Sequence, residues 1–358
     1  MIDNTVSLDS NFRTIEPYTA GEQPDYPDMI KLNTNENPYP PSPKVLEAGS
    51  VFDSKSLRLY PSVDASKLRR AIASYYGFEP GRVFVGVGSD DVLAIIFQTC
   101  FNSGRPVLFP QITYSFYEVW ADLYRIKYKA IPLKADFTID PKDYTGVENG
   151  GIVIANPNAP TSVAMPAEDI CSIIEANPGS IVVIDEAYVD FGGESVMPYL
   201  DKYRNLIVVR TYSKSRSLAG LRIGFAIASE RIISEMENVK NSINSYPMNR
   251  PSIEMGTASL EDEAYFRDKV DRIIKTRTVL TEGLEKLGFK VLPSSTNFVF
   301  ATHPKVKAAY IFEELKKYHI YVRHFRKDLI DDYLRITVGT DQQISVLLEK
   351  LESIINIE

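Results

Sequence analysis

Between residues 66 and 230, short apolar runs alternate with segments whose apolar residues have helical spacing. Apolar runs without polar alternation are typical of strands buried on both faces, and the helices between them are typical of crossovers that join parallel strands. The pattern predicts an α/β fold with a mostly parallel central sheet and helices on both faces. The runs are RVFVGVG, RPVLFP, GIVIAN, SIVVIDEAY, NLIVVRTY and RIGFAIA.

Two breaks in this rhythm predict the domain organisation. Residues 1–30 are polar and contain several Pro and Gly, so we expect an N-terminal arm there. The sequence NSYPMNRP ends the alternation, and a long amphipathic helix ending near Gly288 follows it. The remainder mixes strands and helices. We therefore predict a large α/β domain over 31–245 and a smaller α+β domain over 246–358.

The composition excludes several classes of partner. Forty Lys and Arg against 47 Asp and Glu give a net charge of −7, which disfavours binding to nucleic acid or anionic membranes. The sequence has no secretory leader pattern and no apolar stretch of about 18 residues. Neither the two cysteines nor the three histidines have metal-ligand spacing. We expect a cytoplasmic protein that binds small molecules and no metal.

Polar groups stand directly after five of the predicted strands. Ligands of open α/β sheets bind at the carboxyl ends of the strands, so these groups are candidates for one binding cleft. They are Gly88-Ser89-Asp90, Tyr114, Asn156-Pro157-Asn158, Asp185 to Tyr188, and Ser213-Lys214.

The chemistry of these groups favours pyridoxal phosphate. A lysine in a cleft can offer the neutral amine that joins an aldehyde cofactor, although a single lysine is more often a surface residue. Asp185 directly follows the apolar run IVVI, where a carboxylate is costly unless it meets a positive group such as a pyridinium. Ser89 begins a predicted helix whose free N–H groups can face a phosphate, with the carboxylates of Asp90 and Asp91 pointing away. A plain helix cap would look the same.

Nucleotide motifs are incomplete or missing. GVGSDD has Asp91 where G-x-G-x-x-G requires its last glycine, and the sequence contains no GxxxxGK.

The segment RTYSKSRSLAGLRIG resembles the lysine segment of pyridoxal-phosphate aminotransferases with the aspartate aminotransferase fold, in which an arginine follows the lysine by eight residues. Arg222 has that spacing from Lys214. Further segments extend the resemblance over nearly the whole chain, and together they are similar to the histidinol-phosphate aminotransferases. These segments are LNTNENPYPPS, LRLYPS, VGSDD, TYSFY, NPNAPTS, IDEAYVDF and YLRITVGT.

The resemblance implies an aspartate-aminotransferase-like fold and a homodimeric enzyme of histidine biosynthesis. Its reaction would interconvert L-histidinol phosphate and 2-oxoglutarate with imidazole acetol phosphate and L-glutamate. Lys214 would carry pyridoxal phosphate and act as general base and acid, Asp185 would pair with the ring nitrogen, and Tyr188 with Asn158 would bind the ring hydroxyl. Tyr114 would stack on the ring.

The resemblance also implies the anion-binding residues. Arg335 would bind the glutamate carboxylate as a fork, and Tyr60 would reach the cofactor phosphate from the partner subunit. Asn35 would line the substrate pocket, with Tyr18 and Arg323 near the phosphate end of the amino donor. The cofactor phosphate would be held within this chain by Gly88, Ser89, the Asp90 backbone, Ser213 and Arg222.

Three residues depart from the family pattern. Ala159 and Ser162 stand in the asparagine loop where an asparagine and a glycine are usual, and Ser162 leaves open a different path of the turn because serine adopts positive φ at a cost. Arg216 is expected to add positive charge close to the cofactor.

Other functions stay open at this point. A threonine-phosphate decarboxylase or an aromatic amino acid aminotransferase on the same fold would share Lys214, Asp185 and Arg222. A non-catalytic ligand sensor derived from this fold is disfavoured, because a degenerate copy would be expected to have lost Lys214 or Asp185.

Overall fold

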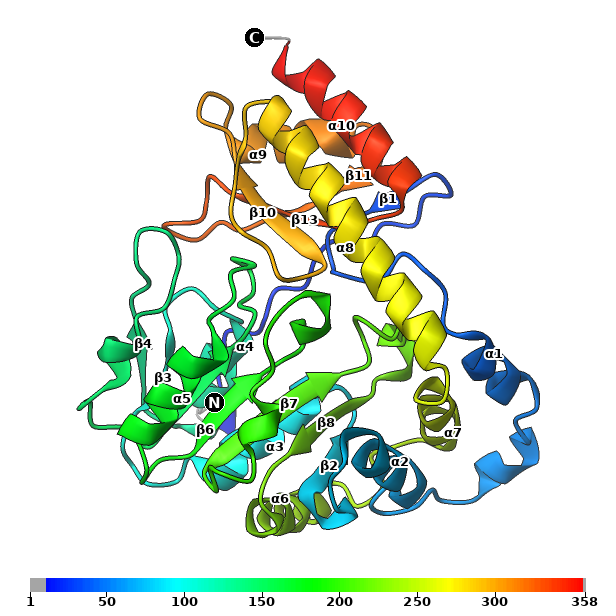
Figure 1. Ribbon diagram of the computed structural model, residues 1–358, viewed down its shortest axis with the longest axis vertical. Helices are drawn as coiled ribbons and strands as arrows, with labels where there is room; N and C mark the ends of the chain where they lie inside the picture. Colours follow the sequence, from blue (N-terminus) through cyan, green and yellow to red (C-terminus); the bar gives the residue numbers. More distant parts are fainter. Residues whose placement is uncertain (1–10, 357–358) are drawn as a thin grey trace, which may run out of the picture.

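The computed structural model describes residues 11–356, and its largest unit is a seven-stranded sheet with helices on both sides (Figure 1). The strand order is β2-β8-β7-β6-β5-β3-β4. The five strands from β7 to β4 are mutually parallel, so the predicted mostly parallel sheet is confirmed. The strands are β2 (Val83–Gly86), β3 (Val107–Pro110), β4 (Tyr128–Ile131), β5 (Gly151–Ala155), β6 (Val182–Asp185), β7 (Leu206–Thr211) and β8 (Gly224–Ile227).

Two strands differ from the expected pattern. β8 runs antiparallel to both of its neighbours, because the connection from β7 holds only the short helix η7 (Ala219–Leu221) and no crossover helix. Lys214 lies in this short connection. β4 is not among the predicted runs, since its sequence YKAI is half exposed at the edge of the sheet.

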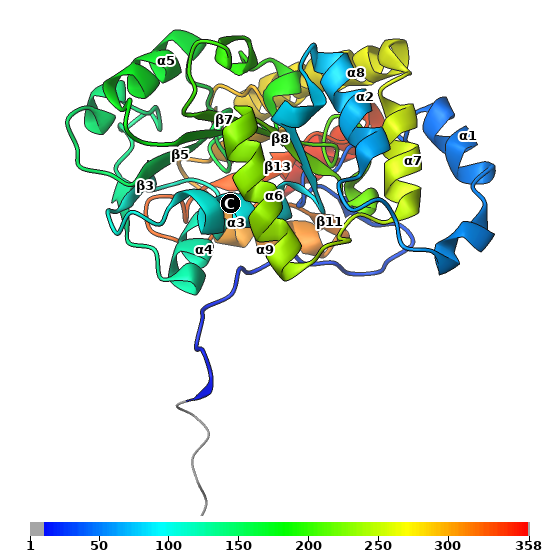
Figure 2. The same ribbon diagram turned by 90° about the horizontal axis from the view of Figure 1, so that it is seen from below.

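Apart from β4, alternate residues of each strand face two different cores, which explains why these strands are apolar throughout. Along β6, Val182 and Ile184 belong to one core and Val183 to the other. Helices α2, α5 and α7 cover the first face and α3, α4 and α6 the second (Figure 2). Their bounds are α2 (Ser66–Tyr76), α3 (Ser89–Cys100), α4 (Phe116–Tyr124), α5 (Ala167–Ala176), α6 (Glu230–Ile243) and α7 (Arg250–Ser259).

A smaller unit packs above the carboxyl ends of the parallel strands (Figure 1). Its four-stranded antiparallel sheet has the order β12-β13-β10-β9, and its helices share a third apolar core. The predicted long helix ends as expected, because Gly288 follows it at φ 87°, a conformation that glycine adopts freely. The elements are α8 (Glu263–Lys286), β9 (Lys290–Val291), β10 (Phe298–Thr302), α9 (Ala308–Lys316), β11 (Ile320–Tyr321), β12 (Arg323–His324), β13 (Leu334–Thr337) and α10 (Asp341–Ile355).

The N-terminal segment joins the two units. Residues 13–29 contain no helix or strand: the start of this arm extends away from the body of the molecule (Figure 2), and residues 18–23 lie against it. β1 (Ile30–Lys31) then pairs with β11, and α1 (Pro43–Ser50) packs on α7. Residues 1–10 of the predicted arm lie outside the described residues. The remaining short helices are η2 (Ser54–Arg58), η3 (Pro80–Arg82), η4 (Pro141–Tyr144), η5 (Val189–Phe191) and η6 (Met197–Tyr199).

The cores into which α7 and α8 pack are relevant to where the large domain ends and the small one begins. Ile253 in α7 packs into the core under the large sheet, whereas Phe266 in α8 packs into that of the small unit. The predicted division between 31–245 and 246–358 stays a prediction. Within residues 11–356, every helix is too short or too polar to cross a membrane.

Candidate active site

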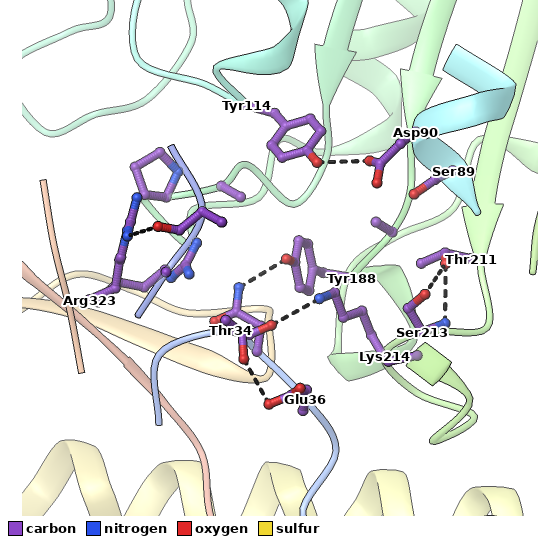
Figure 3. Close-up of a pocket in the computed structure, with 18 of the residues that line it drawn as sticks. Thr34, Glu36, Ser89, Asp90, Tyr114, Tyr188, Thr211, Ser213, Lys214 and Arg323 are labelled. Atoms are coloured by element: carbon purple, nitrogen blue, oxygen red, sulfur yellow. Dashed lines mark hydrogen bonds between the residues drawn. The ribbon is translucent and has the colours of Figure 1, made fainter. Parts of the chain in front are cut away.

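A cavity of about 470 Å³ lies where the large sheet, the small unit and the arm meet (Figure 3). Its walls come from the carboxyl ends of the strands, from arm residues 18–23 and from β12 and β13. The structure therefore brings together side chains that are far apart in the sequence. The predicted residues that line it are Tyr18, Asn35, Ser89, Asp90, Tyr114, Asp185, Tyr188, Ser213, Lys214, Arg222, Arg323 and Arg335.

Lys214 projects from the β7–β8 connection toward the segment that follows β1. Its Nζ donates to the carbonyl oxygen of Thr34 over 3.1 Å and lies 5.8 Å from the ring centre of Tyr188. The hydroxyl of Tyr188 accepts a hydrogen bond from Asn35 Nδ2 over 2.9 Å. Glu36 Oε2 accepts from the Thr34 hydroxyl over 2.7 Å, which fixes the backbone that faces the lysine. Figure 3 shows this chain of contacts beneath Tyr114.

Asp185 ends β6 with its carboxylate buried beneath the cavity. Oδ2 accepts from the Tyr117 hydroxyl over 3.0 Å, and Oδ1 accepts from the backbone N–H of Ala187 over 3.1 Å. Burial raises the pKa of Asp185 to about 6, and these two hydrogen bonds oppose that rise. The neighbouring Glu186 points the other way and pairs with Arg210 over 2.8 Å. Within residues 11–356, Asp185 has no such cationic partner.

A helix N-terminus and an arginine form one end of the cavity. Ser89 is the first residue of α3, and Gly88 before it has φ 89°. A Cβ at Gly88 would lie 2.6 Å from Arg222 Nη2, so a side chain there would displace this guanidinium from its position. The side chains of Ser213 and Thr211 are hydrogen-bonded at 3.0 Å beside it.

The Asp90 carboxylate does not point away from this end, contrary to expectation. Oδ2 lies 3.1 Å from Arg222 Nη2, and Oδ1 accepts from the Tyr114 hydroxyl over 2.8 Å. Asp91 does turn back, since its Oδ2 accepts from the backbone N–H of Val87 over 2.8 Å. The sequence cannot distinguish the two, because both carboxylates lie in the first turn of α3.

Three predicted residues do not line the cavity within this chain: Gly88, Asn158 and Tyr60. Gly88 lies directly before Ser89, the first residue of α3. Asn158 is buried behind the wall, where its Oδ1 accepts from Thr113 and its Nδ2 donates to the Ile112 carbonyl. Tyr60 is 77% exposed and stacks on Tyr246 with ring centres 4.7 Å apart. Its predicted contact from a partner subunit stays a prediction.

Two arginines and the arm close the opposite end. Arg335 Nη2 donates to the Asn33 carbonyl over 2.8 Å, while its buried Nε has no partner among the described residues. Burial lowers the pKa of Arg335. Arg323 donates to the carbonyls of Thr19 and Ala20 over 2.7 and 3.0 Å, which ties the arm to β12. Tyr18 stacks on Phe116 with centres 4.4 Å apart.

Several residues at the site were not predicted from the sequence. Tyr117 lies three residues after Tyr114, close to one helical turn, so its place in TYSFY was an available signal. Thr34 and Glu36 lie within the segment LNTNENPYPPS, on either side of the predicted Asn35. The sequence carries no sign that a backbone carbonyl of this segment would face Lys214.

The structure corrects the expectation for Arg216. Its side chain points away from the cavity: the guanidinium lies 4.2 Å from the ring centre of Phe266, and Nη1 donates to the Ser259 carbonyl over 2.8 Å. It is buried between the large sheet and the start of α8 and adds no charge to the cavity wall. Ser162 has φ 69°, so the asparagine loop keeps the left-handed conformation that glycine favours.

The donor set fits pyridoxal phosphate. Lys214 supplies an amine, Tyr114 an aromatic face, and the N-terminus of α3 with Arg222 supplies phosphate donors. The strongest test is Asp185, because its buried carboxylate faces the cavity without a cation, and a protonated pyridine nitrogen supplies one. Ala159, the other departure from the family pattern, lies in the cavity wall.

Comparisons with known proteins agree with this geometry. Residues 27–351 match the family model of aminotransferase class I and II. The histidinol-phosphate aminotransferase of Lactococcus lactis subsp. lactis is 51% identical over 347 residues, which are 97% of this chain and 96% of that protein.

Solved structures share the fold. The histidinol-phosphate aminotransferase from Sinorhizobium meliloti in complex with pyridoxal-5'-phosphate has a TM-score of 0.83 at 24% identity, covering 92% of this chain and 91% of that chain. The L-threonine-O-3-phosphate decarboxylase from Porphyromonas gingivalis has a TM-score of 0.78 at 23% identity, covering 92% of this chain and all of that chain (100%). The fold alone therefore does not separate the two activities.

The chain belongs to the class I and II aminotransferases. Within that class, its identity to the Lactococcus lactis protein over nearly the full length of both chains places it in the histidinol-phosphate aminotransferase family.

Proposed function

We propose that this protein transfers the amino group of L-histidinol phosphate to 2-oxoglutarate, forming imidazole acetol phosphate and L-glutamate, with pyridoxal phosphate as cofactor. The observation that carries the choice of substrate is the 51% identity to a histidinol-phosphate aminotransferase over 97% of this chain. The position of the reaction in histidine biosynthesis follows from that substrate pair.

The charge distribution of the cavity supports two anionic ligands at once. Arg222 stands beside the N-terminus of α3 at one end, and Arg323 with Arg335 stands beside the arm at the other. A cofactor phosphate needs donors at one end, and the phosphate or carboxylate of the substrates needs them at the other. Lys214 lines the same cavity, so the reacting carbon of a bound donor can reach its amine.

The cofactor, when bound, supplies two groups. One is an aldehyde that reacts with amines, and the other is an electron-withdrawing ring. Asp185 would face the ring nitrogen and keep its proton in place. Lys214 Nζ would remove the proton from Cα of the amino donor as a neutral amine, and the Thr34 carbonyl would accept from Nζ when it is charged. Tyr188, held by Asn35, would orient the ring through its hydroxyl.

We further propose a homodimer that buries an apolar surface next to α1. Tyr60 and Tyr246 stack there, and α1 with the following segment lies at the edge of the molecule (Figure 1). A second copy of the chain is the occupant, since Tyr60 would then approach the partner's cavity. The exposed apolar residues of this region are Leu46, Val51, Leu57, Leu59, Tyr60, Val63, Ile243 and Tyr246. The two free cysteines, Cys100 and Cys171, are consistent with a proposed location in the reducing cytoplasm.

The visible absorbance of the cofactor-loaded protein tests the reaction directly. Adding L-histidinol phosphate without a keto acid should remove the band of the lysine-bound cofactor, and 2-oxoglutarate should restore it. A band that persists with this donor would contradict the proposed substrate. Parallel trials with L-threonine phosphate, followed by assay for carbon dioxide, and with aromatic amino acids then separate the two related activities.

A further inference from the structure

Ser162 connects the loop that holds Asn158 to the small unit. The side chain is fully buried, and the residue takes φ 69°. Its carbonyl accepts from the backbone N–H of Ser295 over 3.0 Å, and its hydroxyl lies 3.1 Å from the carbonyl oxygen of Pro293. Pro293 and Ser295 belong to the segment that enters β10 of the small unit. Two hydrogen bonds at one residue thus cross from the large domain to the small unit.

The loop around Ser162 is closed on itself by hydrogen bonds that join Ser162 to Asn158. The backbone N–H of Ser162 donates to the Asn158 carbonyl, and that of Asn158 donates to the Val163 carbonyl, both over 2.9 Å. Asn158 Nδ2 donates to the Thr161 hydroxyl, also over 2.9 Å. A displacement of Ser162 therefore displaces Asn158.

The other side of the contact leads to Arg335. The Ser294 hydroxyl donates to the Phe298 carbonyl over 2.6 Å, which stiffens the entry to β10. Asn297 Nδ2 donates to the Asn35 carbonyl over 2.9 Å. Within the small sheet, Phe300 of β10 stands opposite Arg335 of β13. The position of residues 293–298 therefore sets where Arg335 stands relative to the cavity.

At position 162, serine adopts an unfavourable backbone conformation, and its hydroxyl makes a specific contact. The left-handed conformation is unfavourable for any residue with a Cβ, and glycine would relieve it. Glycine would also remove the hydroxyl. That hydroxyl carries one proton, for which the Thr161 carbonyl also competes. Of these two hydroxyl contacts, only the one to Pro293 reaches the small unit.

We propose that the Ser162 hydroxyl is a positioning group that ties the Asn158 loop to the small unit and so aligns Arg335 with the cofactor site. The proposal rests on the proposed function to the extent that Asn158 and Arg335 serve cofactor and substrate. Ser162 itself touches neither, since it lies behind the cavity wall.

Two substitutions separate the hydroxyl from the backbone strain. Ser162→Ala removes the hydroxyl and keeps the Cβ, whereas Ser162→Gly removes the hydroxyl and relieves the strain. In the holoenzyme, we expect amide exchange of residues 292–297 to rise about fivefold in both variants, the factor that corresponds to one net hydrogen bond. KM for glutamate should rise by a similar factor, with kcat within about twofold. Ser172→Ala is the matched control, because its hydroxyl donates to the Asp169 carbonyl on the exposed side of α5.

Wild-type exchange in both Ser162 variants would overturn the proposal. A rise in the glycine variant alone would also overturn it, because the changed backbone freedom and not the lost hydroxyl would then be responsible. The exchange measurement requires no substrate. A protein that fails the histidinol phosphate test can therefore still show the exchange change, and the two proposals fail separately.

Discussion

The hydroxyl of Tyr117 donates a hydrogen bond to Oδ2 of Asp185 over 3.0 Å, with both side chains buried beneath the cavity. Burial raises the pKa of Asp185 to about 6, and this hydrogen bond acts against that rise. A hydrogen bond to a carboxylate favours its charged form. Tyr117 therefore helps to keep Asp185 ionised at neutral pH, the state that can face a protonated ring nitrogen.

Tyr117→Phe should weaken cofactor binding by about threefold to tenfold near pH 6.5, because the pKa of Asp185 then rises further and more of the carboxyl is protonated. The deficit should shrink at pH 8.5, where the carboxyl is charged in both proteins. Titration of the cofactor-free protein with pyridoxal phosphate at each pH measures this loss of cofactor affinity. Tyr124→Phe, on the same helix, is the control. Equal affinity of wild type and Tyr117→Phe at both pH values would contradict this role.

Asp185→Asn should stabilise the cofactor-free fold at high pH while removing activity. The pKa of Asp185 in the folded chain is about 6, above the ordinary value of 3.8, so the native state binds this proton more tightly than the unfolded state. Its contribution to the free energy of unfolding is therefore complete below about pH 4 and is lost as the pH rises through 6.

At pH 8 the asparagine variant should be more stable than wild type by about 3 kcal/mol, and the difference should vanish near pH 4. Urea unfolding of the cofactor-free proteins measures this. Asp143→Asn, an exposed carboxylate in η4, supplies the control. A difference that does not depend on pH would show that burial of the charge is not its cause.

Site residues that follow regular strands could be located from the sequence. The direction of a side chain in an irregular connection could not be predicted from it. Asp185, Asn158 and Lys214 could be located because each follows an apolar strand, and the ends of parallel strands share one edge of the sheet. Arg216 is only two residues from Lys214, but the β7–β8 connection has no period from which a face could be assigned. Its side chain turns toward Phe266, away from the cavity.

The small unit shows a similar limit. The run IYVRHF reads as one strand, but Val322 divides it between β11, which pairs with β1, and β12, which pairs with β13. The partner of β11 is only two residues long and lies far away in the chain, so local pattern does not reveal it. Tyr60 shows a different limit, since the role that the family resemblance predicts for it depends on a second copy of the chain.

Two arginines of the same connection should respond in opposite ways to substitution. Arg216→Ala should lower the free energy of unfolding by about 2 kcal/mol, since it opens a gap against Phe266 and leaves the Ser259 carbonyl without its donor. Cofactor affinity and KM for the amino donor should stay within about twofold of wild type. Arg222→Ala should leave stability nearly unchanged and weaken cofactor binding by tenfold to about a hundredfold. Urea unfolding and cofactor titration on both variants decide this, and a shifted donor preference in Arg216→Ala would reinstate a role at the cavity.

Lys214→Ala should abolish the visible band of the lysine-bound cofactor and reduce transamination by about 10³-fold or more. The fold should persist, because Nζ makes one hydrogen bond, to the Thr34 carbonyl. Lys214→Arg, which keeps the charge without the primary amine, should behave in the same way. Turnover at the wild-type rate in either variant would refute the assignment of this lysine.

Mixing two impaired variants tests the dimer and the site together. If Tyr60 serves the cavity of the partner subunit, Tyr60→Ala and Lys214→Ala damage each site from opposite sides of the interface. A mixed dimer then has one site in which the Lys214 of the Tyr60→Ala chain meets the intact Tyr60 of the other chain, and one site that lacks both. Equal amounts of the two variants, unfolded and refolded together, should recover about a quarter of the wild-type turnover. Half of the dimers are then mixed, and each mixed dimer has one intact site of two. The same variants mixed without refolding should show only the average of their separate rates. If refolding brings no gain over that average, Tyr60 acts within its own chain or not at all, and the shared site is wrong.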